Sequence, residues 1–223
     1  MEWSQWLQGG PFLEVSFLLE LKEEKTKTVQ DIINNLSKVT NEIEVVDENV
    51  DEIIDFFNRG YPYDEEDSQT INLHSLRLRL YVYLLRKRKA ILQLEVVSPN
   101  ALMVNFWFYG DGNDEPEYDQ VGIMKEEFIG FTSFLQELYS IYEFIIGGIA
   151  FEEDVLKLFG FEKTYPNECF RYENASPTHF LKEPSSFINI IWNEKYEKLS
   201  HIPYNYQRLD KEGILIETSD FNV

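Results

Sequence analysis

The sequence predicts an α+β fold in which helices pack on a mixed or antiparallel sheet. Strand-like alternation of apolar and polar residues dominates residues 73–109, whereas apolar residues recur at helical spacing in 28–39, 47–58 and 126–142. Because the two periodicities occupy separate stretches, helices and strands are segregated, as in α+β proteins. Hydrophobic residues at 43% and aromatic residues at 15% of the chain exclude a disordered protein.

The first sixty residues predict a strand, a helix, a second strand and a second helix. The stretch Phe12–Leu21 is apolar with polar residues in alternating places, which is typical of a strand buried on one face. Thr28 is expected to cap the first helix, and Ile43–Val46 is expected to form a short strand. Asp47 is then expected to open the second helix.

Residues 73–109 predict a three-stranded antiparallel meander. Leucine and valine alternate with arginine and tyrosine from Leu76 to Tyr83, a two-residue repeat. Arg86–Lys89 is expected to be a polar turn, followed by strands at Ile91–Val97 and Leu102–Tyr109. Short polar turns between successive strands favour antiparallel neighbours.

After an acidic loop, the chain predicts one long helix and a further strand. The helix is expected at 126–142, where aromatic and leucine side chains form one apolar stripe. Phe144–Phe151 predicts a strand with a bend at its two glycines, and Asp154–Phe159 predicts a short helix. Residues 165–223 are expected to form an extension with short elements at Phe170–Tyr172, Phe187–Tyr196 and Gly213–Thr218.

The length and composition predict one domain over residues 1–223. The polar stretch 60–70 is the expected place for any internal boundary. The single cysteine, Cys169, excludes an intrachain disulfide and favours a reducing compartment, where we expect an inert thiol beside Glu168. With no basic and apolar leader and no apolar run of about 20 residues, we expect a cytoplasmic protein that does not bind membranes.

The sequence carries no local signature of catalysis, a metal ion or a cofactor. Its histidines are isolated, without the paired spacing of metal ligands. They are His74, His179 and His201. The acidic loop Gly110–Asp119 has carboxylates at alternate positions, but Pro116 and Gly122 stand where a calcium loop needs a glycine and a bidentate glutamate. No phosphate-binding glycine loop and no serine nucleophile motif occurs, so we predict no cofactor and no catalytic residue.

One short stretch, Val155–Lys163 (VLKLFGFEK), resembles the helix, Leu-Gly-Phe-Glu and strand found near the C-terminus of GNAT-type acetyltransferases. The resemblance covers about nine residues and implies an acyl-CoA-dependent transferase. In that family an Arg/Gln-x-x-Gly-x-Gly/Ala loop before a helix binds the pyrophosphate of acetyl-CoA. Here the loop before the long helix, Gly110–Gly122, is rich in carboxylates instead.

Charge is segregated along the chain, which has a formal net charge of −20. Residues 41–67 hold eleven acids and one base, and residues 110–154 hold twelve acids and one base. Residues 68–94 hold six bases and no acid. On the second predicted helix, Asp47, Asp51 and Asp55 are spaced four apart, so that like charges line one exposed face at a cost to helix stability.

This pattern leads to a hypothesis about function. An acidic surface repels nucleic acid and anionic membranes, so the expected partner is a basic protein. We therefore expect a non-enzymatic binding protein, most concretely an immunity protein or antitoxin that neutralises a toxin. Three alternatives stay open: a small-molecule enzyme with a dispersed site, a self-associating structural protein, and acidity that serves solubility alone.

The expected partner-binding residues are the carboxylates of the second helix and of the acidic loop. They are Asp47, Glu48, Asp51, Glu52, Asp55, Asp111, Asp114, Glu115, Glu117 and Asp119. Aromatic residues near these carboxylates are expected to act as anchors for the partner. They are Tyr61, Tyr63, Trp107, Tyr109 and Tyr118.

Overall fold

A computed structural model describes residues 6–22, 24–39, 42–63, 66, 72–159, 176–182, 184 and 186–218. Nine strands form one sheet, and every neighbouring pair in it is antiparallel. The strands are β1 (Phe12–Glu20), β2 (Ile43–Val45), β5 (Ser75–Tyr83), β6 (Lys87–Ser98), β7 (Ala101–Tyr109), β8 (Ile146–Phe151), β9 (Phe187–Asn193), β10 (Asn205–Arg208) and β11 (Gly213–Glu217). Their order is β10-β11-β9-β8-β1-β7-β6-β5-β2, which confirms the predicted α+β fold with its antiparallel meander β5-β6-β7.

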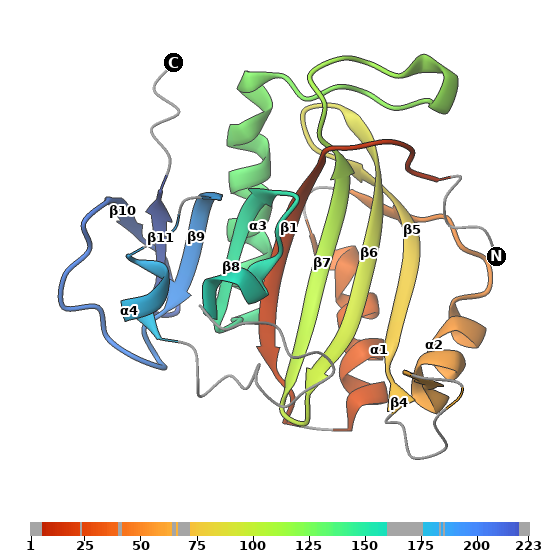
Figure 1. The fold of residues 1–223 in the computed structure, drawn as a ribbon, viewed down its shortest axis with the longest axis horizontal. Coiled ribbons are helices and arrows are strands. Elements are labelled where there is room, and N and C mark those ends of the chain that lie inside the picture. Colours follow the sequence, from red (N-terminus) through yellow and green to blue (C-terminus); the bar gives the residue numbers. More distant parts are fainter. Residues whose placement is uncertain are drawn as a thin grey trace.

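Three helices longer than two turns accompany the sheet. They are α1 (Lys25–Asn35), α2 (Val50–Arg59) and α3 (Phe128–Tyr142). Figure 1 shows α1 and α3 behind the sheet and α2 beside its β5 edge. Short helical segments follow at η2 (Leu36–Lys38), η3 (Pro116–Tyr118), η4 (Lys125–Glu127), η5 (Val155–Phe159) and α4 (Pro177–Phe180).

The sheet buries apolar side chains on both faces. Alternate residues of β5, such as Leu78 and Leu80, are fully buried in the core that they share with α1, α2 and α3. A second core on the opposite face, towards β8 and β9, joins Met103 to Trp192 and to Phe180 of α4. Because both faces are covered, β7 is buried along almost its whole length rather than on alternate residues.

The helix starts differ from those predicted. Helix α1 begins at Lys25 rather than at Thr28, whose hydroxyl donates a hydrogen bond to the Glu24 carbonyl at 3.3 Å from within the first turn. Helix α2 begins at Val50 rather than at Asp47. Both sequence patterns located the helix correctly but misplaced its first residue, because the true starts carry no capping side chain.

Two predicted interruptions of strands are wrong. Lys87–Lys89, expected in a turn, belongs to β6, because Arg88 points into the protein and is buried there. Gly147 and Gly148, expected to bend the chain, pair with β1 and β9 inside β8. A Cβ on Gly147 would lie 2.7 Å from the ring of Phe144, so this glycine provides space for close packing.

The predicted boundary and extension are only partly within the described residues. Of the stretch 60–70, positions 64, 65 and 67–70 lie outside them, and its start forms β3 (Tyr61–Pro62), which pairs with β4 (Asn72–Leu73). The expected short element Phe170–Tyr172, with Cys169, also lies outside them. The later part of the extension provides β9, β10 and β11 to the sheet, and β10 was not predicted because all four of its residues are exposed.

Candidate functional site

The basic residues of β5 and β6 are paired with acids from distant parts of the chain. Arg86 and Arg88 both donate hydrogen bonds to the carboxylate of Glu127, and both also donate to the Gly122 carbonyl. The Glu127 side chain is fully buried, and that of Arg88 is 2% exposed. Burial by itself raises the pKa of Glu127, but the hydrogen bonds from Arg86, Arg88 and the Met124 N–H outweigh it and lower the pKa to about 2.

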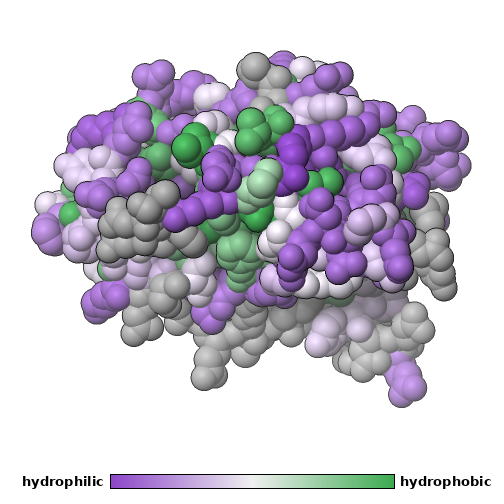
Figure 2. Space-filling view, turned by 90° about the horizontal axis from the view of Figure 1, so that it is seen from above, coloured by the Kyte–Doolittle hydropathy of each residue, from purple (hydrophilic) through white to green (hydrophobic). Residues whose placement is uncertain are grey.

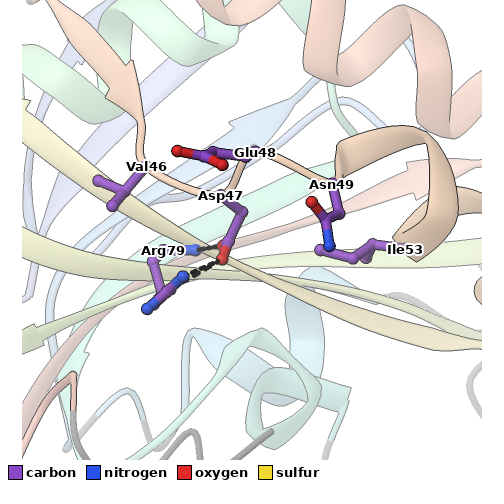
Figure 3. Close-up of a pocket in the computed structure, with 6 residues that line it drawn as sticks. All are labelled: Val46, Asp47, Glu48, Asn49, Ile53 and Arg79. Atoms are coloured by element: carbon purple, nitrogen blue, oxygen red, sulfur yellow. Dashed lines mark hydrogen bonds and ion pairs between the residues drawn. The ribbon is translucent and has the colours of Figure 1, made fainter.

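Asp47 forms a second buried ion pair, with Arg79 (Figure 3). Its carboxylate accepts a hydrogen bond from the Arg79 backbone N–H at 2.6 Å and another from Arg79 Nε at 2.7 Å. The Asp47 side chain is 3% exposed. The Asp47 carboxylate therefore takes the place of a strand partner for β5 just beyond the end of β2. The prediction that Asp47 lies on an exposed helix face is wrong.

Three more basic side chains of the two strands also have partners within the fold. Lys87 Nζ lies 3.2 Å from the Glu44 carboxylate, and Lys89 Nζ lies 3.6 Å from that of Asp119. The guanidinium of Arg77 lies over the Trp107 ring, 4.6 Å from its centroid. The basic segment therefore does not form a free cationic surface, and the net negative charge is carried by acids elsewhere.

The acids of α2 and its approach remain open to solvent. Asp51, Glu52 and Asp55 are exposed on the helix, and Glu48 is exposed two residues before it. Among the described residues these four carboxylates have no ion pair or hydrogen bond from another side chain. We call these four residues the α2 acidic face.

The acidic loop uses several of its carboxylates to hold its own shape. Asp111 accepts a hydrogen bond from the Asn113 backbone N–H, and Asp114 accepts one from the Gly122 N–H, each at 2.8 Å. Asp119 is paired with Lys89, and the Glu115 carboxylate accepts a hydrogen bond from the Tyr109 hydroxyl. Figure 1 shows this loop at the top of the molecule and α2 at the lower right, so the structure does not bring the two predicted acidic groups together.

A groove of about 580 Å³ runs between α2 and the sheet. It is lined by Asn49, Glu52, Ile53, Phe56, Tyr61, Ser75, Leu76, Arg77, Gln93 and Glu95. A smaller hollow of about 260 Å³ shares Asn49 and Ile53 with it and ends at the Asp47–Arg79 pair (Figure 3). The groove therefore borders the α2 acidic face through Glu52.

Among the described residues, one buried polar atom in the lining of the groove has no hydrogen-bond partner. Gln93 is 7% exposed, and its Nε2 donates a hydrogen bond to the Glu95 carboxylate at 2.6 Å. Its Oε1 is buried without a hydrogen-bond donor. Buried amide oxygens in folded proteins are almost always paired, so an unpaired one indicates a place where a donor can be added.

Further polar residues lie beside Gln93 on the same face of the sheet. Gln93 lies in register between Arg77 of β5 and Asn105 of β7. Asn105 Oδ1 and Trp107 Nε1 are also buried without a partner, although Asn105 Nδ2 donates to Glu14. Three strands therefore place polar groups side by side next to the groove.

Aromatic side chains form one wall of the groove. Phe56 is 49% exposed and stacks on Tyr61, with ring centroids 6.1 Å apart, and Tyr61 is 37% exposed. Burial, followed by the nearby Glu95 carboxylate, raises the pKa of Tyr61. Of the other predicted anchors, Tyr63 and Tyr118 are exposed, but Tyr109 is 5% exposed and is buried in the fold.

Sequence reasoning missed Gln93, Glu95 and Phe56. The signal for the first two was present, since Gln93 and Glu95 interrupt the otherwise apolar stretch Ile91–Val97 at positions two apart. Phe56 directly precedes Phe57, and adjacent residues on a helix point about 100° apart, so one can be buried while the other is exposed. The structure buries Phe57 and exposes Phe56.

An apolar surface occurs at the end of the molecule that carries the acidic loop. Figure 2 shows a mainly hydrophilic surface, with apolar atoms near its centre. Leu85 in the β5–β6 turn is 66% exposed, and Ile129 at the start of α3 is 76% exposed.

Metal and histidine chemistry find no support in the described residues. No group of three or more histidine, cysteine, aspartate or glutamate side chains is placed there to hold a metal ion. His74 links α2 to the β4–β5 junction, because its Nδ1 bonds the Phe57 carbonyl and its Nε2 accepts from Lys25, each at 2.8 Å. No helix in the described part of the chain combines the length and apolarity needed to span a bilayer.

Comparisons with known proteins do not assign a function. No protein-family model matches the sequence, and neither the curated proteins nor the solved structures give a match. The geometry of α2 and of the groove beside it is therefore the basis on which a function can be proposed.

Proposed function

We propose that this chain is a non-enzymatic binding protein that engages a basic protein partner through the α2 acidic face. The observation that carries the proposal is the difference between the two sets of charges. The bases of β5 and β6 are held in contacts within the fold, whereas Glu48, Asp51, Glu52 and Asp55 are exposed and form no ion pair with another described residue. An uncompensated surface field of this kind attracts an oppositely charged partner.

The placement of aromatic side chains supports the same proposal. Phe56 and Tyr61 lie at the border of the α2 acidic face and are large, exposed side chains. Protein interfaces obtain most of their binding energy from a few aromatic and arginine side chains surrounded by a polar rim. The carboxylates would attract the partner, and the aromatic pair would provide apolar contact area.

The cost of the arrangement to the helix also supports a role in binding. Asp51 and Asp55 are four residues apart on α2, and such a like-charge pair destabilises a helix by roughly 0.2–0.5 kcal/mol. The repulsion counts most at Asp55, because Asp51 and Glu52 lie in the first turn, where the helix dipole favours a carboxylate. The most concrete form of the proposal is an immunity protein or antitoxin, whose toxin partner is basic and whose complex must form quickly.

The proposal is tested by isolating the partner and reconstituting the complex from purified proteins. We expect a protein with a basic surface, whose dissociation constant rises by at least tenfold between 50 and 200 mM salt, since screening weakens the attraction over about 10 Å. Calorimetry with the two purified proteins measures this. A reconstituted complex whose affinity is unchanged over that salt range, or the recovery of no basic partner, contradicts the proposal.

A further inference from the structure

We propose that the groove between α2 and β5 receives an arginine or lysine side chain of the partner. This inference rests on the proposed function and specifies its contact chemistry. Four features of the described residues carry it: an unpaired acceptor, two carboxylates, an aromatic wall and an opening next to the α2 acidic face.

The unpaired acceptor is Gln93 Oε1. The Nε2 of the same amide is held by Glu95 at 2.6 Å, which fixes the orientation of the amide and leaves the oxygen as the unpaired atom. A buried acceptor gains from a donor, and leaving it unpaired costs stability. A guanidinium or ammonium group carries several N–H donors and no acceptor, so it matches the atom that lacks a partner.

The charges in the lining favour a cation. Glu52 and Glu95 contribute two carboxylates and Arg77 contributes one guanidinium. The Arg77 guanidinium lies over the Trp107 ring, so its charge is directed towards β7. The groove therefore has a net negative lining, and the exposed acids of α2 next to it strengthen this potential.

The aromatic wall suits the stem and head of a long cationic side chain. Phe56 stacks on Tyr61 at the groove, and the Arg59 guanidinium lies 5.9 Å from the centroid of the Phe56 ring. The chain itself thus places a cation against this ring. Arginine and lysine bury their methylene stems against apolar surface while the charged end makes polar contacts.

The outer edge of β5 also borders the groove. Strand β2 pairs with β5 at residues 80–82, and Val46 and Asp47 bond the backbone of Arg79. Beyond that point Ser75 and Arg77 pair with no described strand of the sheet on their outer side, and both line the groove. A partner side chain entering here meets these polar residues as well as the aromatic wall.

The test uses three small probes: the N-acetyl methylamides of arginine, norleucine and glutamate. Each is titrated into isotope-labelled protein, and the amide resonances are followed by NMR, including the side-chain amide of Gln93. We expect the arginine probe to shift the Gln93 side chain and the backbone of Asn49, Phe56 and Ser75, with far smaller shifts from norleucine. Shifts caused by the glutamate probe instead would mean that Arg77 dominates the groove, and would overturn the inference.

Variants test whether the arginine probe binds in the groove. Gln93→Leu removes the acceptor, and Glu95→Gln removes one charge, so each is expected to weaken arginine binding about tenfold. Glu117→Gln on the acidic loop removes an exposed charge far from the groove and is expected to leave binding unchanged. Equal weakening by all three variants, or none by the two groove variants, contradicts the inference.

The failure of this inference is distinguishable from failure of the proposed function. If the reconstituted partner binds in a salt-dependent way but is unaffected by Gln93→Leu and Glu95→Gln, the groove is not its site and only the present inference falls. If no basic partner exists, the proposed function falls, whatever the probes show.

Discussion

At the scale of single residues, Glu127 is the most completely buried carboxylate among the described residues. It forms ion pairs with two arginines, one of which is itself buried. We predict that Glu127→Gln lowers the free energy of unfolding by about 3–5 kcal/mol, because it leaves Arg88 buried without a counter-charge. Urea denaturation measures this. The neighbouring Glu126→Gln, at an exposed position, should change stability by less than about 0.5 kcal/mol.

The same residue gives a prediction about pH. The folded-state pKa of Glu127 is about 2, below its ordinary value of 4.5, so its carboxylate stabilises the fold above pH 4.5. That contribution is lost as the pH falls from 4.5 to about 2. The difference in unfolding free energy between the wild type and Glu127→Gln should be constant above pH 5.5 and shrink by about 3 kcal/mol towards pH 2. A difference independent of pH would contradict the assignment.

Asp47 and Asp55 have different roles, because Asp47 is a structural carboxylate and Asp55 is a surface carboxylate. Both belong to the same acidic run of the sequence, but Asp47 is buried against Arg79 whereas Asp55 is exposed on α2. We predict that Asp47→Asn costs about 1–3 kcal/mol, since it weakens bonds to a charged group at a buried position. Asp55→Asn should be neutral or stabilise slightly, because it relieves repulsion from Asp51. Thermal unfolding of both variants measures the contrast.

At the scale of elements, β8 depends on its glycines for close packing. A Cβ on Gly147 would lie 2.7 Å from Phe144 Cε2 and 2.9 Å from Phe17 Cβ. We predict that Gly147→Ala destabilises the protein by about 1–3 kcal/mol through overpacking. Gly112→Ala is the matched control, because the nearest atom to its added Cβ is 4.0 Å away. Equal stability of the two variants, measured by urea denaturation, would contradict this account of β8.

The periodicity of apolar and polar residues predicted most helices and strands, but not the contacts that determine where they end. The alternation from Leu76 to Tyr83 follows from burial of one residue in two, and the structure keeps it. Arg86–Lys89 was predicted as a turn because four charged residues in a row are typical of solvent-exposed chain. The buried partner that draws Arg88 into β6 is Glu127, 39 residues later, and such a pairing leaves no trace in local periodicity.

At the scale of the whole molecule, the order of strands in the sheet determines where the groove and the first acidic run lie, and the sequence alone could not show this order. Strand β1 lies between β7 and β8 rather than beside β2, and β2 forms the edge next to β5. This order carries the first acidic run to the open edge of the sheet and forms the groove beside Gln93. The sequence identified the acidic residues of α2, whereas the groove required the pairing of strands that are distant in the chain.

Ion pairs between distant parts of the chain also determine which charges remain on the surface. The six bases between residues 68 and 94 were an apparent basic surface in the sequence. The structure places Glu44, Asp47, Asp119 and Glu127 beside five of them. The acids that remain exposed define the surface that a partner meets.

The most direct test of the central claim compares two variants of equal net charge for binding to the reconstituted partner. One neutralises the α2 acidic face (Glu48→Gln, Asp51→Asn, Glu52→Gln, Asp55→Asn). The other neutralises four exposed acids elsewhere (Asp31→Asn, Glu117→Gln, Glu126→Gln, Asp210→Asn). We predict that the first raises the dissociation constant by at least a hundredfold and flattens its salt dependence, whereas the second changes it less than threefold. Equal loss in the two variants would show that net charge alone governs binding, and would contradict the assignment to α2.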